Sequence, residues 1–266
     1  MKLGLIHYNA PGDTLEEFLD YVADTGFECV ELRGTDLWPD GVDDPKPSTV
    51  EAKQMCDDRG LVVSGVSLGN DFVLLDDDAI AEQVERAQRF AELALMCDCN
   101  IFRTEGGRPK DEVPEDRQAE AIIKCVTACL PMCEEMDIYL AIDNHGVVSN
   151  DYELQLEVFE AVASPHVGAN CDTMNYRWFG YEVDKLPEIY EAIAPYVMHT
   201  HMKDGTGARG EYVGAALGDG EIPLDVALKA FKGAGYDGAY CAEYEGKEDS
   251  AIGYRKCLDW LRANVT

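Results

Sequence analysis

The sequence predicts a single α/β domain over residues 1–266, built as a closed (β/α)8 TIM barrel. Short apolar runs alternate eight times with longer segments whose apolar residues recur at helical spacing. No stretch rich in Pro, Gly or Ser divides the chain, and its length is close to the roughly 250 residues that such barrels take. An open dinucleotide-binding sheet would need Gly-x-Gly-x-x-Gly after its first strand, and residues 7–12 read His-Tyr-Asn-Ala-Pro-Gly.

Each predicted strand is a short apolar run, and each predicted helix is the amphipathic segment that follows it. The strands are expected at residues 3–8, 29–32, 62–67, 101–104, 139–143, 167–171, 197–202 and 239–243. The helices are expected near residues 14–25, 48–59, 77–97, 115–136, 152–162, 183–194, 223–234 and 250–263. Capping residues mark three of the helix starts: Asp13 and Thr14 with Glu17, Ser48 with Glu51, and Asp225 after Pro223.

The charge balance narrows the possible partners. The chain has 52 acidic and 22 basic residues, a formal net charge of −30. Such a field repels phosphate backbones and anionic lipid surfaces, which argues against nucleic-acid and membrane binding. No window approaches the ~20 consecutive apolar residues of a membrane span. The ten cysteines lie within apolar runs without a Cys-x-x-Cys pair, so we expect buried, reduced thiols in a cytoplasmic protein.

Potential metal ligands gather where four consecutive predicted strands end. In a barrel of this kind the carboxyl ends of the strands carry the active site. Taken alone, Asp172 before Thr173 is also typical of a helix cap, and His201 is also typical of a buried structural histidine. Ligand-capable side chains at the ends of four neighbouring strands, however, favour a shared site. Carboxylates with one imidazole suit Mn²⁺, Mg²⁺ or Co²⁺. The strand ends carry Asp143 and His145, then Asp172, then His199, His201 and Lys203, then Glu243 and Glu245.

These strand ends belong to a set of motifs that recur through the chain. The motifs are Gly26-Phe27-Glu28-Cys29-Val30-Glu31-Leu32-Arg33, Leu140-Ala141-Ile142-Asp143-Asn144-His145-Gly146, Asp172-Thr173-Met174-Asn175, His199-Thr200-His201-Met202-Lys203-Asp204, Leu217-Gly218-Asp219-Gly220-Glu221-Ile222 and Tyr240-Cys241-Ala242-Glu243-Tyr244. In order and spacing, over essentially the whole chain, they resemble the xylose isomerase-like (β/α)8 barrels. That superfamily includes sugar isomerases, epimerases, inosose dehydratases and the endonuclease IV type of DNA-repair enzyme.

The resemblance implies a single-metal site made by Asp143, Asp172, His201 and Glu243. The family usually has glutamate where this chain has Asp143, so that residue would bind the metal directly or through a water. The substitution also puts in doubt the epimerase mechanism in which two glutamates shuttle the proton. A three-metal nuclease would need more histidines than the five present, and Asn175 stands three residues after Asp172.

The resemblance implies that the protein removes a proton beside a carbonyl and forms an enediolate that one divalent ion stabilises. For this ion we expect Mn²⁺, with Mg²⁺ or Co²⁺ as alternatives. We expect His145 as the base, because imidazole accepts protons near neutral pH, with Glu243 as the alternative base and also a ligand. His145 could instead orient a metal ligand, and the aromatic residues around Trp178 could simply pack against their own helix. The expected substrate-binding residues are His7, Arg103, Asn175, Trp178, His199 and Lys203.

Two enzyme classes and one non-enzyme class stay open at this point. An isomerase or epimerase would reprotonate the enediolate of a sugar. A lyase would expel a β leaving group from a 3-oxo sugar, as inosose dehydratases and the catalytic subunits of C-glycoside deglycosidases do. The latter implies a small partner subunit, and otherwise we expect a homo-oligomer. A barrel that binds no metal and serves as a scaffold is the third possibility.

Overall fold

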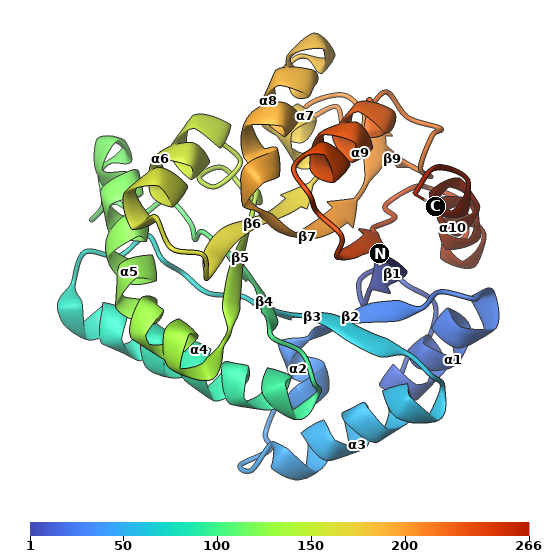
Figure 1. The fold of residues 1–266 in the computed structure, drawn as a ribbon, viewed down its shortest axis with the longest axis horizontal. Helices are drawn as coiled ribbons and strands as arrows, with labels where there is room; N and C mark the ends of the chain where they lie inside the picture. Colours follow the sequence, from blue (N-terminus) through green and yellow to red (C-terminus); the bar gives the residue numbers. More distant parts are fainter. Residues whose placement is uncertain (266) are drawn as a thin grey trace.

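The computed structural model describes residues 1–265 as a closed barrel of eight parallel strands with helices on its outside (Figure 1). Around the barrel the strands run β1-β2-β3-β4-β5-β6-β7-β10, each pairing with its neighbours in parallel. The predicted fold class is confirmed. The barrel strands are β1 (Lys2–Ile6), β2 (Cys29–Arg33), β3 (Val62–Leu68), β4 (Ile101–Glu105), β5 (Tyr139–Asp143), β6 (Val167–Asp172), β7 (Val197–Met202) and β10 (Ala239–Ala242).

The helices cover the barrel in chain order, so that most lie between the two strands they connect. They are α1 (Leu15–Thr25), α2 (Gly34–Leu37), α3 (Lys46–Asp58), α4 (Asp77–Met96), α5 (Gln118–Met136), α6 (Tyr152–Val162), α7 (Asn175–Phe179), α8 (Leu186–Ile193), α9 (Leu224–Gly233) and α10 (Ser250–Asn264). Short 3-10 turns lie at Glu115–Arg117, Val183–Lys185 and Ala194–Tyr196. None of the helices in the described part of the chain is long and apolar enough to cross a membrane.

The helix starts agree with the predicted caps in one case of three. At α1 the capping box forms: Glu17 donates its backbone N–H to the Thr14 hydroxyl, and the Glu17 carboxylate accepts the backbone N–H of Thr14. The Ser48 cap is wrong, because α3 starts two residues earlier, where Pro at its first turn fixes a helical φ. The cap at Asp225 is also wrong, since α9 begins at Leu224 and Asp225 lies inside its first turn.

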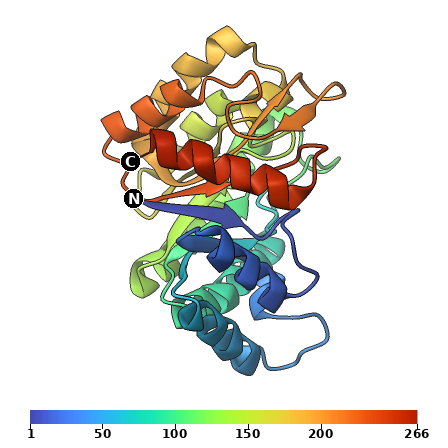
Figure 2. The same cartoon turned by 90° about the vertical axis from the view of Figure 1, so that its right-hand side faces the viewer.

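A hairpin at the carboxyl end of the strands is a feature that the apolar pattern did not predict. It consists of β8 (Asp204–Thr206) and β9 (Val213–Ala215), and Figure 2 shows it at the opposite side of the barrel from the two chain termini. Asp204 holds it in place, because its carboxylate accepts backbone N–H groups from Gly205, Gly218, Gly220 and Ile222. The loop that follows β7 is therefore anchored at the end of the strand that carries His201.

The interior of the barrel near β1 is filled by thiols. All ten cysteines are free and buried, as predicted. Gly4 on β1 lies between Cys29 on β2 and Cys241 on β10, and a Cβ placed on it would come within 2.6 Å of the Cys29 Sγ and 2.9 Å of the Cys241 Sγ. Glycine is needed here because the two thiols occupy the space of a side chain.

Replacing Gly4 with Ala should therefore lower the free energy of unfolding by about 1–3 kcal/mol, the usual cost of overpacking a core. The added Cβ would also lie 2.8 Å from the backbone oxygen of Cys29, which cannot move as a side chain can. Gly69→Ala is the matched control, because a Cβ at Gly69 meets no atom within 4 Å. Urea unfolding followed by circular dichroism measures both variants, and equal midpoints would contradict the crowding of the barrel interior.

Candidate metal and substrate site

Strand register brings the predicted ligands together at the carboxyl ends of β5, β6, β7 and β10. Asp172 on β6 pairs with His201 on β7, and Asp143 on β5 pairs with Asn170 on β6. Glu243 follows β10 directly and donates its backbone N–H to the carbonyl of Met202. Because all barrel strands run in parallel, these polar side chains lie at the same end of the barrel.

Three of the four predicted metal ligands form one buried group. Ligand atoms of Asp172, His201 and Glu243 all lie within 4.8 Å of one another. His201 Nδ1 is 3.2 Å from Glu243 Oε2. Among residues 1–265, neither His201 Nδ1 nor Asp172 Oδ2 has a hydrogen-bond partner, although both are buried. A buried polar atom without a partner costs about 1–3 kcal/mol, and a bound cation would satisfy both atoms at once. The donor set thus fits a divalent ion.

Asp172 is fixed so that one oxygen faces this group. Its Oδ1 accepts the backbone N–H groups of Met174 and Asn175 at 2.8 and 3.0 Å, which leaves Oδ2 directed at the group. Burial, with the nearby charges of Glu243 and Asp143, raises the pKa of Asp172 to about 8 in the metal-free chain, even though Lys203 acts in the opposite direction. A cation beside this oxygen would favour the ionised form.

Lys203 supplies one positive charge to the same carboxylates. Its Nζ lies 2.8 Å from Glu243 Oε1, 3.0 Å from Glu245 Oε2 and 3.8 Å from Asp172 Oδ2. Burial works against the charges of Lys203 and Glu243, but their mutual attraction outweighs it, raising the pKa of Lys203 and lowering that of Glu243. Glu243 is therefore an ionised carboxylate, one oxygen of which is held by the ammonium.

Asp143, the fourth predicted ligand, is engaged elsewhere. One of its oxygens contacts the guanidinium of Arg103 and the other accepts the side-chain N–H of Asn170 at 2.6 Å. In the described part of the chain it belongs to neither of the two groups whose ligand atoms converge. Arg103 outweighs the effect of burial and lowers the pKa of Asp143. His145 Nδ1 lies 3.8 Å from Asp143 Oδ2, so the predicted base stands next to this ion pair.

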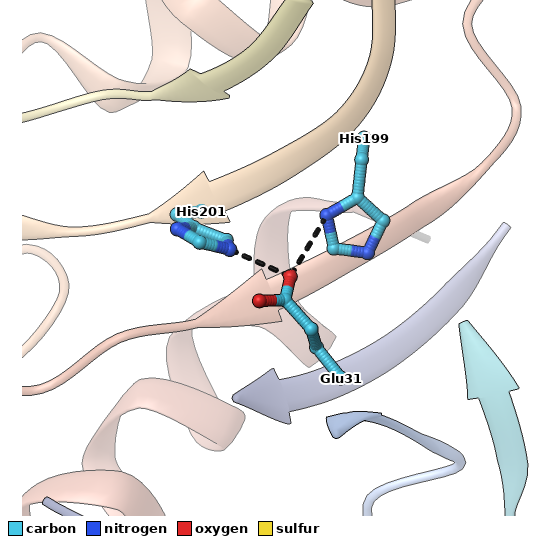
Figure 3. A group of neighbouring side chains, drawn as sticks. All are labelled: Glu31, His199 and His201. Carbon is cyan, nitrogen blue, oxygen red and sulfur yellow. Dashed lines mark hydrogen bonds and ion pairs between the residues drawn. The ribbon is translucent and has the colours of Figure 1, made fainter. Parts of the chain in front are cut away.

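The second converging group consists of Glu31, His199 and His201 (Figure 3). Glu31 Oε2 is 2.7 Å from His201 Nε2 and 3.4 Å from His199 Nδ1. His199 Nδ1 also lies 2.9 Å from the side-chain oxygen of Asn170. Glu31 Oε2 thus has a hydrogen-bond partner in His201 Nε2, and His199 Nδ1 has one in Asn170, in contrast to the two unpartnered atoms of the Asp172–His201–Glu243 group.

A cavity of about 260 Å³ opens above both groups. It is enclosed by predicted site residues together with others that the sequence did not single out. A cavity of about 660 Å³ lies at the opposite end of the barrel, around Met1, Lys2 and Pro195, away from the strand ends that carry chemistry in this fold. The lining of the smaller cavity is Ile6, His7, Tyr8, Glu31, Arg33, Ser67, Arg103, Glu105, His145, His201, Glu243 and Glu245.

The predicted substrate-binding residues divide into two sets. His7 and Arg103 line the smaller cavity; His7 stacks on Phe18 and is 2.8 Å from Asp36 through Nδ1. His199 is buried between Asn170 and Glu31 and lines the larger cavity instead. Lys203 is not among the residues that line the smaller cavity, but it contacts Glu243 and Glu245, which do line it.

Asn175 and Trp178 lie on the short helix α7. The Asn175 side chain donates to the carbonyl of Asn144, so it ties α7 to the end of β5. The Trp178 ring packs beside the guanidinium of Arg209, whose carbon lies 5.9 Å from the ring centroid. Neither residue lines the smaller cavity. The aromatic residues of this segment thus pack against the protein, as Tyr176 does when it donates its hydroxyl to Gln155.

Glu31 and Tyr8 line the cavity and were not among the residues expected from the sequence, whereas Glu245 was among the strand-end carboxylates but was given no role. Glu31 carried a usable signal, because it is a charged residue inside the apolar run of β2 and is 2% exposed. A charge in such a position needs a partner. Tyr8 lies in the loop after β1, where polar residues are common, so the sequence alone offers no signal for it.

Known proteins share this fold over the full chain. A solved structure of an IolI protein with a bound zinc atom superposes with a TM-score of 0.79 at 16% identity, covering 100% of this chain and 96% of the other. D-psicose 3-epimerase from Clostridium cellulolyticum, solved with D-tagatose, gives 0.80 at 16% identity over 100% and 99%. The probable 3-DHS dehydratase AsbF of Bacillus anthracis gives 0.75 at 16% identity over 100% of both chains.

At these identities the solved structures show a shared fold. The family itself is shown by sequence: the model of the xylose isomerase-like TIM barrel family matches residues 19–264. That match spans nearly all of the chain and includes every residue placed in the two converging groups. The protein belongs to the xylose isomerase-like TIM barrel family.

Proposed function

We propose that the protein is a divalent-metal-dependent enzyme that removes a proton beside the carbonyl group of a sugar or sugar-derived substrate and gives an isomerised or epimerised product. The convergence of Asp172, His201 and Glu243, with two buried atoms that lack partners, carries this proposal. The zinc atom in the IolI structure and the sugar in the epimerase structure support it, because both proteins have the same fold.

Asp172, His201 and Glu243 would hold the metal, for which we propose Mn²⁺, since two carboxylates and one imidazole form a mostly oxygen set. When bound, the metal supplies Lewis-acid stabilisation of negative charge that develops on the substrate carbonyl oxygen. Asp143 is not required to complete this set, because Arg103 and Asn170 already hold its two oxygens. Three protein ligands leave positions open for substrate oxygens.

His145 is the better candidate for the base that takes the proton. Its side chain is 51% exposed and lines the cavity, so a substrate C–H can approach it. Lys203 holds one oxygen of Glu243 and, against the effect of burial, lowers its pKa, which makes this carboxylate a weak proton acceptor. Lys203 instead neutralises Glu243, and its ammonium can return a proton only at the cost of breaking two ion pairs.

The cavity suits a small polar substrate. Its volume of about 260 Å³ is below the roughly 300 Å³ at which sites for drug-sized ligands begin, so it encloses no more than about one sugar ring. Arg33 offers a guanidinium whose side chain is 51% exposed, and His7 stands beside it. These groups, with Arg103, are the donors proposed for substrate hydroxyls.

A lyase is the second candidate, and the state of Asp143 favours it. Epimerisation by two carboxylates needs a free carboxylate on strand β5, and here Arg103 occupies that group. One base and one Lewis acid suffice to form an enediolate that expels a β leaving group. The structural likeness to the probable 3-DHS dehydratase is compatible with this route. A 3-oxo sugar would be the substrate class, and a small partner subunit could complete the site.

Metal analysis followed by deuterium exchange tests the proposal. The purified protein reconstituted with Mn²⁺ should hold about one ion per chain, as measured by mass spectrometry. Incubation in D2O with D-tagatose and with a 3-oxo-glucoside should place deuterium at the carbon beside the carbonyl, or release the leaving group. Absence of metal after reconstitution, with no exchange in either sugar, would overturn the proposal in favour of a scaffold barrel.

A further inference from the structure

Glu31 stands out among the buried charges because it contacts a proposed metal ligand from the side opposite the metal. It lies in β2 and its Oε2 is 2.7 Å from His201 Nε2. The other nitrogen of the same ring, Nδ1, faces Glu243 at 3.2 Å and has no hydrogen-bond partner within residues 1–265. The Nε2–H donates to Glu31, so the lone pair of Nδ1 is free for a cation.

Glu31 is itself held by a chain of buried side chains. Asn170 donates its N–H to Asp143 Oδ1 at 2.6 Å, so its oxygen must accept from His199 Nδ1 at 2.9 Å. His199 therefore carries its proton on Nδ1, which also lies 3.4 Å from Glu31 Oε2. The hydrogen bonds thus define one ring orientation and one tautomer for His199, and they fix Glu31 in place.

The burial of Glu31 gives this arrangement its significance. Glu31 is 2% exposed, and a carboxylate in such a position is costly unless it is paired. A neutral apolar residue would fill this strand position at less cost, so the carboxylate's contact with His201 is the property that sets it apart.

We propose that Glu31 is the positioning residue of the metal site, which orients His201 and increases the donor strength of its Nδ1. The inference rests on the proposed metal-binding function and names a residue that lies outside the ligand set. Carboxylates that accept the second N–H of a metal-bound histidine fix its tautomer and ring orientation, and their loss typically lowers metal affinity about 10- to 100-fold.

Calorimetric titration of Mn²⁺ into the chelator-treated full chain tests this role. Glu31→Met removes the acceptor and should weaken Mn²⁺ binding about 10- to 100-fold. Glu31→Gln keeps an oxygen that can accept from Nε2 but lacks the charge, so its affinity should lie between those of Glu31→Met and the unmodified chain. Glu105→Gln is the matched control, because Glu105 lines the same cavity but contacts Arg103 and not His201.

The outcomes separate this inference from the proposed function. If the unmodified chain binds no Mn²⁺, the metal site itself is wrong. If it binds Mn²⁺, and Glu31→Met and Glu105→Gln weaken binding equally, Glu31 acts only as a general charge and the positioning role is overturned. Histidine ¹⁵N spectra of the zinc-loaded unmodified chain test the tautomer without any variant, and a His201 proton on Nδ1 instead of Nε2 would also overturn it.

Discussion

His201→Ala should abolish binding of a divalent ion, and with it the chemistry that depends on the ion. The imidazole is the nitrogen donor common to both converging groups, and its Nδ1 is one of two buried atoms in the Asp172–His201–Glu243 group that lack a hydrogen-bond partner among residues 1–265. Removing it leaves only Asp172 and Glu243, and Glu243 is already bound by Lys203. Two carboxylates that attract one ammonium between them cannot replace the lost ligand.

The measurement is the effect of Mn²⁺ on unfolding. A ligand at a concentration of 100 times its dissociation constant stabilises a folded protein by about 2.7 kcal/mol, so the unmodified chain should unfold at higher urea concentration with Mn²⁺ than with EDTA. His201→Ala should show no difference between the two conditions. His166→Ala is the control, because His166 stacks on Tyr139 and bonds the Ile138 carbonyl, apart from the cavity. A Mn²⁺-dependent shift retained in His201→Ala would contradict the assignment of this ligand.

The sequence predicted the fold because the features that define a barrel are local. Each strand is an apolar run and each long helix an amphipathic one, so eight alternations are enough to indicate eight βα units. The short elements were missed for the same reason: α7 and the β8–β9 hairpin have too few residues to show a period. The Ser48 cap failed because the helix begins two residues earlier, with Pro47 in its first turn.

Three of the four predicted ligands converge because their positions follow from chain order alone: each ends a strand, and all strands of the barrel end on one side. The environment of Asp143 could not be predicted in this way. It depends on Arg103 from β4 and Asn170 from β6, the strands on either side of β5, both reaching Asp143, which is set by strand register. Asn170 also faces His199 on β7, at a point where the register between β6 and β7 shifts. Contacts of this kind are non-local, and no spacing along the sequence encodes them.

His145→Asn should separate proton transfer from metal binding. Loss of a general base typically costs about 10²–10⁴-fold in rate, so deuterium incorporation into D-tagatose or a 3-oxo-glucoside should fall by that factor. Mn²⁺ affinity should stay unchanged, because His145 belongs to neither converging group and its exposed side chain contacts only Asp143 among the predicted ligands. Glu243→Gln, by contrast, should lose both properties together.

The pattern across these variants decides which residue takes the proton. If His145 is the base, His145→Asn exchanges slowly with full Mn²⁺ occupancy, and His166→Asn behaves as the unmodified chain does. If Glu243 is the base, His145→Asn exchanges deuterium as fast as the unmodified chain. The argument that the ion pair with Lys203 makes Glu243 a weak base is then wrong. Lys203→Met then tests this base directly, because removing the ammonium partner would raise the basicity of the Glu243 carboxylate. Deuterium exchange in this variant would then be faster at equal Mn²⁺ occupancy.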